Sequence, residues 1–305
     1  MKFKKDKTMN RAILGGAFII IALLGVFGLF SGNKDDKNPV SAIVPAGMSS
    51  IELEAAMSVN GLRSVEFAGV SSDITVTRTN SNTITVKVTG HARTTPKLVS
   101  GKNGSVGTFE VKWPKSITNN ARDMKMEVFL PADYQEDVSF SSVSGDIHLT
   151  ERSNFSDVTL KTVSGDIRNK ETSSNSYSAT TVSGSLSLSD IFSEDTSLSS
   201  ISGDINYTGS LVSLTASSVS GDCNFSLDSL TGRIKLNSAS GDIELKLPES
   251  ISARIDFSTV SGNLSSDIPI LTTGSKKNHL SGTIGGGNYS IEGHTVSGDI
   301  HISKN

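Results

Sequence analysis

The residues with the clearest chemical potential in this chain are regularly spaced aspartates that each follow a Ser-Gly pair. Stacked along one edge of a repeat structure, such carboxylates would supply the oxygen ligands that Ca²⁺ prefers. Alternatively, each Asp only hydrogen-bonds to backbone near its turn. Ser185, Asn263 and Thr283 interrupt the series, which favours the turn role, so we predict no metal site and no cofactor. The aspartates are Asp146, Asp166, Asp204, Asp222, Asp242 and Asp299.

A second series consists of hydroxyl side chains three residues before the glycines. A ladder of hydroxyl groups inside a corner of the fold is the plain interpretation, and a sugar-binding surface is the alternative. Its members are Ser142, Thr162, Thr181, Ser200, Ser218, Ser238, Thr259 and Thr295, with His279 in the eighth repeat.

No arrangement typical of catalysis or of metal binding is present in the sequence. The histidines His91, His148, His279, His294 and His301 lack metal-ligand spacing. Cys223 follows Asp222 at an apolar repeat position, so we expect a small core residue. Three consecutive glycines, 285–287, lack the Lys-Ser/Thr of a phosphate-binding loop. We therefore predict no catalytic residue and no enzyme.

The chain is an internal repeat. Successive Ser-Gly pairs lie 18 to 21 residues apart, with a final interval of 16. Because Gly adopts a positive φ readily, we expect it to form the corner of a turn. The repeat glycines are Gly145, Gly165, Gly184, Gly203, Gly221, Gly241, Gly262, Gly282 and Gly298.

The residues around each glycine predict strands. The positions two before and two after it are apolar in all nine repeats, as in Val219 and Cys223, and we expect both columns to be buried. Apolar and polar residues alternate beyond them, as in Val158 and Leu160, which is typical of half-buried strands. Each repeat is then strand, turn, strand. Paired repeats could form the blades of a β-propeller, but identical residues at one position favour stacked coils. The predicted fold is all-β, a parallel β-solenoid with an N-terminal transmembrane helix.

Composition and hydropathy locate the chain. Net charge is −3 and the pI is near 6.0, which argues against nucleic-acid binding. One cysteine excludes an intrachain disulfide. Residues 12–30 carry no charge, and the flank before them is basic, so the positive-inside rule places the N-terminus in the cytoplasm and the rest outside. A cleaved signal peptide is the alternative. We expect a basic flank (1–11), a transmembrane helix (12–30), a linker (31–49), an irregular β region (50–134) and the repeat solenoid (135–305).

The turn core Val-Ser-Gly-Asp-Ile at 143–147, 163–167 and 296–300, with the segments 128–149 and 243–263, resembles a family of adhesin β-strand-repeat proteins. This family of unknown function includes LiaG-like cell-envelope proteins of Gram-positive bacteria. The resemblance covers about residues 62 to 305. It implies a membrane-tethered solenoid at the cell surface, sometimes linked to envelope stress, and it implies no catalytic reaction.

Three functions follow as hypotheses. The first is a non-enzymatic surface protein that contacts the membrane through residues 12–30 and binds an envelope protein or wall polymer through a flat, hydroxyl-rich face. The second is an accessory of envelope-stress signalling. The third is a polysaccharide-active enzyme, which requires an acid, base or metal cluster outside the repeat consensus.

Overall fold

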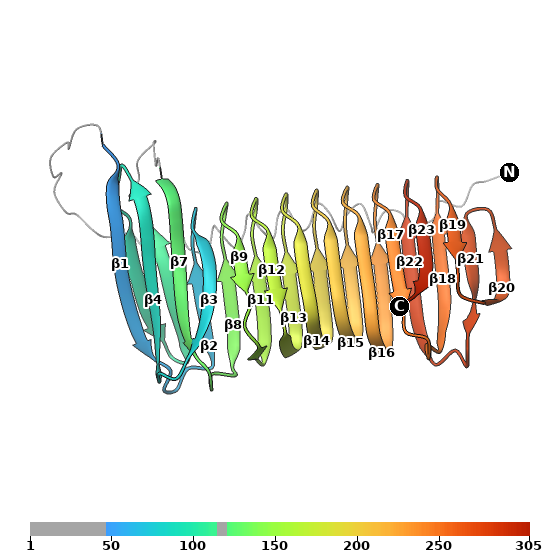
Figure 1. Cartoon of the computed structure of the whole chain (residues 1–305), viewed down its shortest axis with the longest axis horizontal. Coiled ribbons are helices and arrows are strands. Elements are labelled where there is room, and N and C mark those ends of the chain that lie inside the picture. The colour runs from blue at the N-terminus through green and yellow to red at the C-terminus, as the bar shows by residue number, and fades with distance from the viewer. Residues whose placement is uncertain (1–46, 115–120) are drawn as a thin grey trace.

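The computed structural model describes residues 47–114 and 121–305, and these form one elongated stack of β-strands (Figure 1). No α-helix occurs in the described ranges, and therefore none of sufficient length and apolar character to span a bilayer. The predicted basic flank, the transmembrane segment 12–30 and most of the linker lie outside those ranges. The repeats form a solenoid with mostly parallel pairing between coils, not propeller blades.

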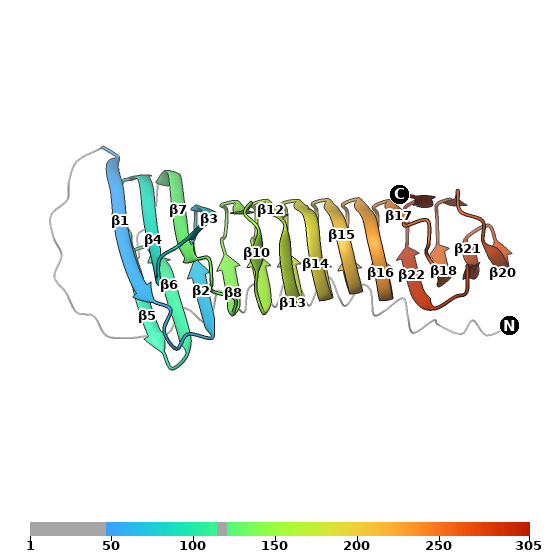
Figure 2. The same cartoon turned by 60° about the horizontal axis from the view of Figure 1, so that its bottom comes forward.

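The N-terminal end of the stack is an antiparallel cap. Within it β1 (Ser49–Ser58) pairs with β4 (Thr83–Ala92), and β4 pairs with β7 (Ala121–Pro131). The hairpin of β5 (Lys97–Asn103) and β6 (Val106–Lys112) lies beside them (Figure 2).

The solenoid begins earlier than the predicted boundary at residue 135. Strand β2 (Ser64–Ala68) pairs in parallel with β8 (Asp137–Ser141), and β3 (Asp73–Thr79) pairs in parallel with β9 (Ile147–Leu149). Segment 64–79 is thus the first coil, although its turn reads Val-Ser-Ser-Asp without a glycine.

The next coils follow one another in sequence order. Each has a strand before the Ser-Gly turn, which builds the first face, and a strand after it, which builds the second face. Strands β14 to β16 are long enough to contribute to both faces. The strands are β10 (Ser153–Asn154), β11 (Asp157–Lys161), β12 (Ile167–Lys170), β13 (Thr172–Thr180), β14 (Leu186–Ser199), β15 (Ile205–Ser217), β16 (Cys223–Asn237) and β17 (Ile243–Leu247).

The last coil of the chain lies inside the stack, not at its end. Strands β22 (Tyr289–Thr295) and β23 (Ile300–Lys304) pair in parallel with β16 and β17 on one side. On the other side they pair in parallel with β18 (Ala253–Thr259) and β19 (Leu264–Ser266). Figure 1 shows β22 and β23 between these neighbours. The chain therefore passes over one coil position and returns about 40 residues later to fill it.

A hairpin closes the C-terminal end of the stack. One of the nine predicted turns, at Gly282, is wrong because it lies in this hairpin. Strand β21 (His279–Ile284) pairs antiparallel with β18 and with β20 (Leu271–Lys276). Gly282 therefore lies within a strand, and Leu280 and His279 do not belong to the apolar and hydroxyl columns of the turn. The spacing of 20 residues between Gly262 and Gly282 is a coincidence that the local motif could not reveal.

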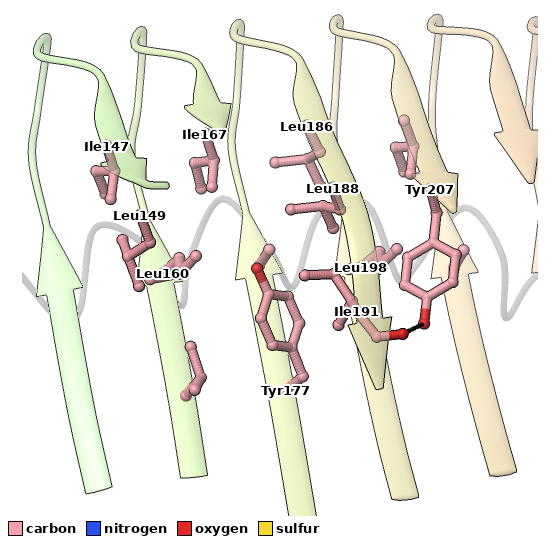
Figure 3. Close-up of a cluster of buried hydrophobic side chains, with 14 of the residues drawn as sticks. Ile147, Leu149, Leu160, Ile167, Tyr177, Leu186, Leu188, Ile191, Leu198 and Tyr207 are labelled. Carbon is pink, nitrogen blue, oxygen red and sulfur yellow. Dashed lines mark hydrogen bonds between the residues drawn. The ribbon is translucent and has the colours of Figure 1, made fainter. Parts of the chain in front are cut away.

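The core is one layer of side chains between the two faces. Ile147, Ile167, Leu186 and Ile205 lie one above another on successive coils, and all are fully buried. Figure 3 labels the first three. At the N-terminal end Phe67 stacks on Phe109 and Phe140, with ring centroids 5.5 and 4.8 Å apart. Because adjacent coils lie about 4.8 Å apart, identical side chains at one position pack directly against each other, which explains the apolar columns.

The turn glycines serve close approach and not a positive φ. None of the eight at the turns has a positive φ. At each of them, a Cβ would collide with a backbone carbonyl oxygen of the adjacent coil; for Gly203 this is the carbonyl of Gly184. Glycine is required because two coils touch here through their backbones.

Candidate functional site

The repeated aspartates form a hydrogen-bonded ladder along one corner. The Asp146 carboxylate accepts a hydrogen bond from the backbone N–H of Asp166 at 2.8 Å, and Asp222 accepts one from Asp242 at 2.9 Å. Each carboxylate thus accepts its hydrogen bond from the backbone of the adjacent coil and not from its own turn. Asp73 begins the ladder by accepting from Asp146 at 3.0 Å.

One arginine spans two carboxylates of the ladder. Arg168 bridges Asp146 and Asp166 at 3.0 and 2.7 Å. Within the described residues, no group of three or more His, Cys, Asp or Glu side chains converges on a point where a metal ion could bind. What the structure shows is a ladder of hydrogen bonds that links the backbones of adjacent coils.

The hydroxyl column lies inside the same corner. Thr162 accepts a hydrogen bond from the N–H of Gly165 at 3.0 Å, and Ser200 accepts one from Gly203 at 2.8 Å. The eight Ser and Thr members are buried. Their hydroxyls satisfy the turn and are not presented to a ligand.

The apolar column two residues before each glycine differs from its prediction. Val219 is half-buried and Val260 is 59% exposed, because these side chains lie on the outer side of the turn. The column two residues after the glycine is the one that fills the core.

Burial raises the pKa values of one cysteine and two tyrosines in the core. Cys223 is buried, and burial with nearby Asp222 and Asp204 raises the pKa of its thiol to about 12. Burial likewise raises the pKa of Tyr177 and Tyr207 above the ordinary tyrosine value. Tyr207 donates a hydrogen bond to the Ile191 carbonyl at 2.9 Å (Figure 3).

The first face of the solenoid carries a flat array of small hydroxyl side chains. One outward residue from each of β8, β11, β13, β14 and β15 occupies the same register position. Parallel strands place these residues about 4.8 Å apart. We call this set the hydroxyl face: Ser139, Thr159, Ser178, Ser197 and Thr215.

The C-terminal end of the first face is different, because charged residues replace the hydroxyl series around a cavity of about 350 Å³. The outward residues of β22, β18, β21 and β20 line it in two rows. The first row is Ser290, Arg254 and Thr283, and the second is Glu292, Asp256, Ser281 and Thr273; Leu271, in register with Thr283, extends the first row beyond the cavity lining. We call these eight residues the C-terminal basin.

The C-terminal basin holds three charged residues, of which Arg254 and Asp256 are exposed and Glu292 is half-buried. Asp256 lies 3.0 Å from Nε2 of His279. Arg254 and Glu292 form no ion pair with any residue that the structure describes. Leu271, at the edge of the basin, is 77% exposed. Sequence reasoning missed this cluster because its members come from four strands outside the turn motif.

Residues 63–303, well over half of the chain, match the family model described as Toastrack DUF4097. The chain belongs to the Toastrack family. This confirms the resemblance to the adhesin-like repeat family, a domain of unknown function. No curated protein matches this Toastrack chain.

Solved structures with a similar fold cover most of this Toastrack chain at low identity. One, from Parabacteroides distasonis and called a "putative lipid binding protein", is 16% identical, covers 83% of this chain and 96% of its own, and has a TM-score of 0.49. A "putative adhesin" from Parabacteroides merdae is 10% identical, with the same coverage and a TM-score of 0.47. Another from Bacteroides fragilis is 15% identical, covers 82% and 96%, and has a TM-score of 0.44.

Proposed function

We propose that this protein is a non-enzymatic protein of the bacterial cell surface, anchored in the membrane by residues 12–30, which binds an envelope polymer or protein along its hydroxyl face. The observation that carries the binding role is that face itself. Five hydroxyl side chains at one register position make a regular row of uncharged polar groups along the face. An extended partner with repeating polar groups can follow such a surface over several coils.

The rigid stack supports this role. Adjacent coils hold one another through parallel strand pairing and through the buried corner, so the face keeps its spacing without a partner. The apolar segment 12–30 with its basic flank supports the anchor and the outward orientation of the domain.

Orientation is tested with protease on intact, wall-stripped cells. Digestion of the repeats is expected, and full protection would contradict a surface location.

Binding is tested with purified cell-wall sacculi and a triple variant, Thr159→Arg, Ser178→Arg and Ser197→Arg, which breaks the hydroxyl face. We expect it to lose retention on the sacculi. The matched control places the same three changes on the second face, as Ser187→Arg, Asn206→Arg and Asn224→Arg, and should be retained like the parent. Equal retention of both variants would exclude the hydroxyl face as the binding surface.

A further inference from the structure

We infer that the C-terminal basin binds an uncharged sugar ring, as a site separate from the hydroxyl face. This inference rests on the proposed function only in that it places the domain among envelope glycans. It depends on the composition and geometry of the basin.

The polar groups of the basin can pair with a sugar hydroxyl both as a hydrogen-bond donor and as an acceptor. Asp256 and Glu292 can only accept hydrogen bonds when ionised, and the guanidinium of Arg254 can only donate. A pair of neighbouring sugar hydroxyls can donate to one carboxylate and accept from the guanidinium at the same time. Ser290 lies beside Arg254 on one side, and Thr283 and Ser281 lie beside Arg254 and Asp256 on the other; their hydroxyls can donate or accept.

The basin also offers one apolar contact. Leu271 is in register with Thr283, so it lies on the same outward side as the polar rows and at their edge. Leu271 is 77% exposed, so its side chain is accessible beside the polar cavity. It provides a surface for the C–H side of a pyranose ring, while the hydroxyl groups face the polar rows.

The charge balance favours an uncharged ring over an acidic one. A carboxylate or phosphate in the basin would face Asp256 and Glu292 at short range, with Arg254 inside the cavity and Arg233 and Lys235 on the adjacent strand as the nearby cations. An ammonium group would be attracted by Asp256 and Glu292 but would face Arg254, with Arg233 and Lys235 on the adjacent strand. An uncharged sugar meets neither penalty and still satisfies Arg254 and Glu292, which lack ion-pair partners among the described residues.

The test is an array of uncharged, acidic and amino-sugar glycans, probed with the full-length chain in detergent. We expect retention on uncharged glycans. Glu292→Gln and Leu271→Ser, two surface changes that leave the core intact, should each weaken that binding by about tenfold or more. The control Arg233→Gln removes a charge from β16, opposite Ser290 in the register and outside the cavity, and should bind like the parent.

Three results would overturn the inference: no binding to any uncharged glycan, preference for acidic glycans, or an equal loss in Arg233→Gln. The triple variant of the hydroxyl face distinguishes this site from the proposed function. That variant should still bind the glycan array and should lose its retention on the sacculi. If it loses both, the basin is not a separate site; if it keeps both, the hydroxyl face is not the binding surface.

Discussion

The carboxylate of Asp242 accepts a hydrogen bond from the backbone N–H of Asp299 at 2.7 Å, across 57 residues of chain. Asp299 in turn accepts from the N–H of Asn263 at 2.7 Å. The ladder therefore runs from Asp242 to Asp299 and then to Asn263, although Asn263 precedes Asp299 in the sequence. These two hydrogen bonds join the last coil to the two earlier coils on either side of it.

Removing a rung of the ladder should destabilise the stack. Asp242→Ala leaves the Asp299 N–H without its acceptor, so we expect the free energy of unfolding to fall by about 1 kcal/mol. Asp242→Asn keeps an acceptor oxygen and should lose less. Urea denaturation measures both, and an equal loss in the two variants would show that charge, not hydrogen bonding, is what matters at this position.

Calcium should not be required for the fold. One oxygen of most ladder carboxylates already accepts from the adjacent coil, and in the described ranges no cluster of metal ligands converges. Thermal melts in millimolar Ca²⁺ and in excess chelator are expected to agree within a few degrees. A large rise with Ca²⁺ that disappears in an Asp204→Asn, Asp222→Asn, Asp242→Asn variant would reverse this conclusion.

A methyl group at a turn glycine should be costly. In Gly221→Ala the new Cβ meets the carbonyl oxygen of Gly203, a backbone atom that cannot turn aside, and we expect a loss of about 2 kcal/mol or more. Gly101→Ala is the control, because its nearest neighbour is the Thr108 hydroxyl at 3.3 Å, a side-chain atom that can move. The comparison fails if both variants show the same urea midpoint.

The inserted coil, residues 288–305, should be removable from the chain and should bind back to it as a separate peptide. A chain that ends at residue 287 lacks β22 and β23, which exposes the edges of four strands and removes the buried Ile291 and Ile300. We expect a lower melting temperature, restored by a synthetic peptide of residues 288–305. The same peptide with Ile300→Asp should not restore it, since it places a charge in the core. A truncated chain that melts like the parent would contradict the assigned strand order.

Stability should fall in alkaline solution. The pKa of Tyr207 is raised in the folded state, chiefly by burial, so the folded protein keeps a proton that the unfolded chain releases above about pH 10. The free energy of unfolding is thus unaffected by this group at lower pH and decreases as the pH rises beyond 10. Tyr207→Phe should make the decrease shallower in urea titrations across that range, and an unchanged slope would mean that Tyr207 does not titrate as described.

The repeat motif was sufficient to predict the β-solenoid, the buried hydroxyl column and the buried position of Cys223, because each depends on local strand and turn chemistry. Alternation puts Leu160 inward, and the spacing of Thr162 and Gly165 closes the turn.

Tertiary structure alone decided three other features. Gly165 is required by the carbonyl of Gly145 on the neighbouring coil, an atom that sequence cannot place at contact distance. Gly282 matches the repeat spacing but pairs antiparallel with Ile255, because a hairpin closes the stack at that point. Strand β22 pairs with β16 on one side and with β18 on the other, and the C-terminal basin depends on this order because it brings Glu292 beside Asp256.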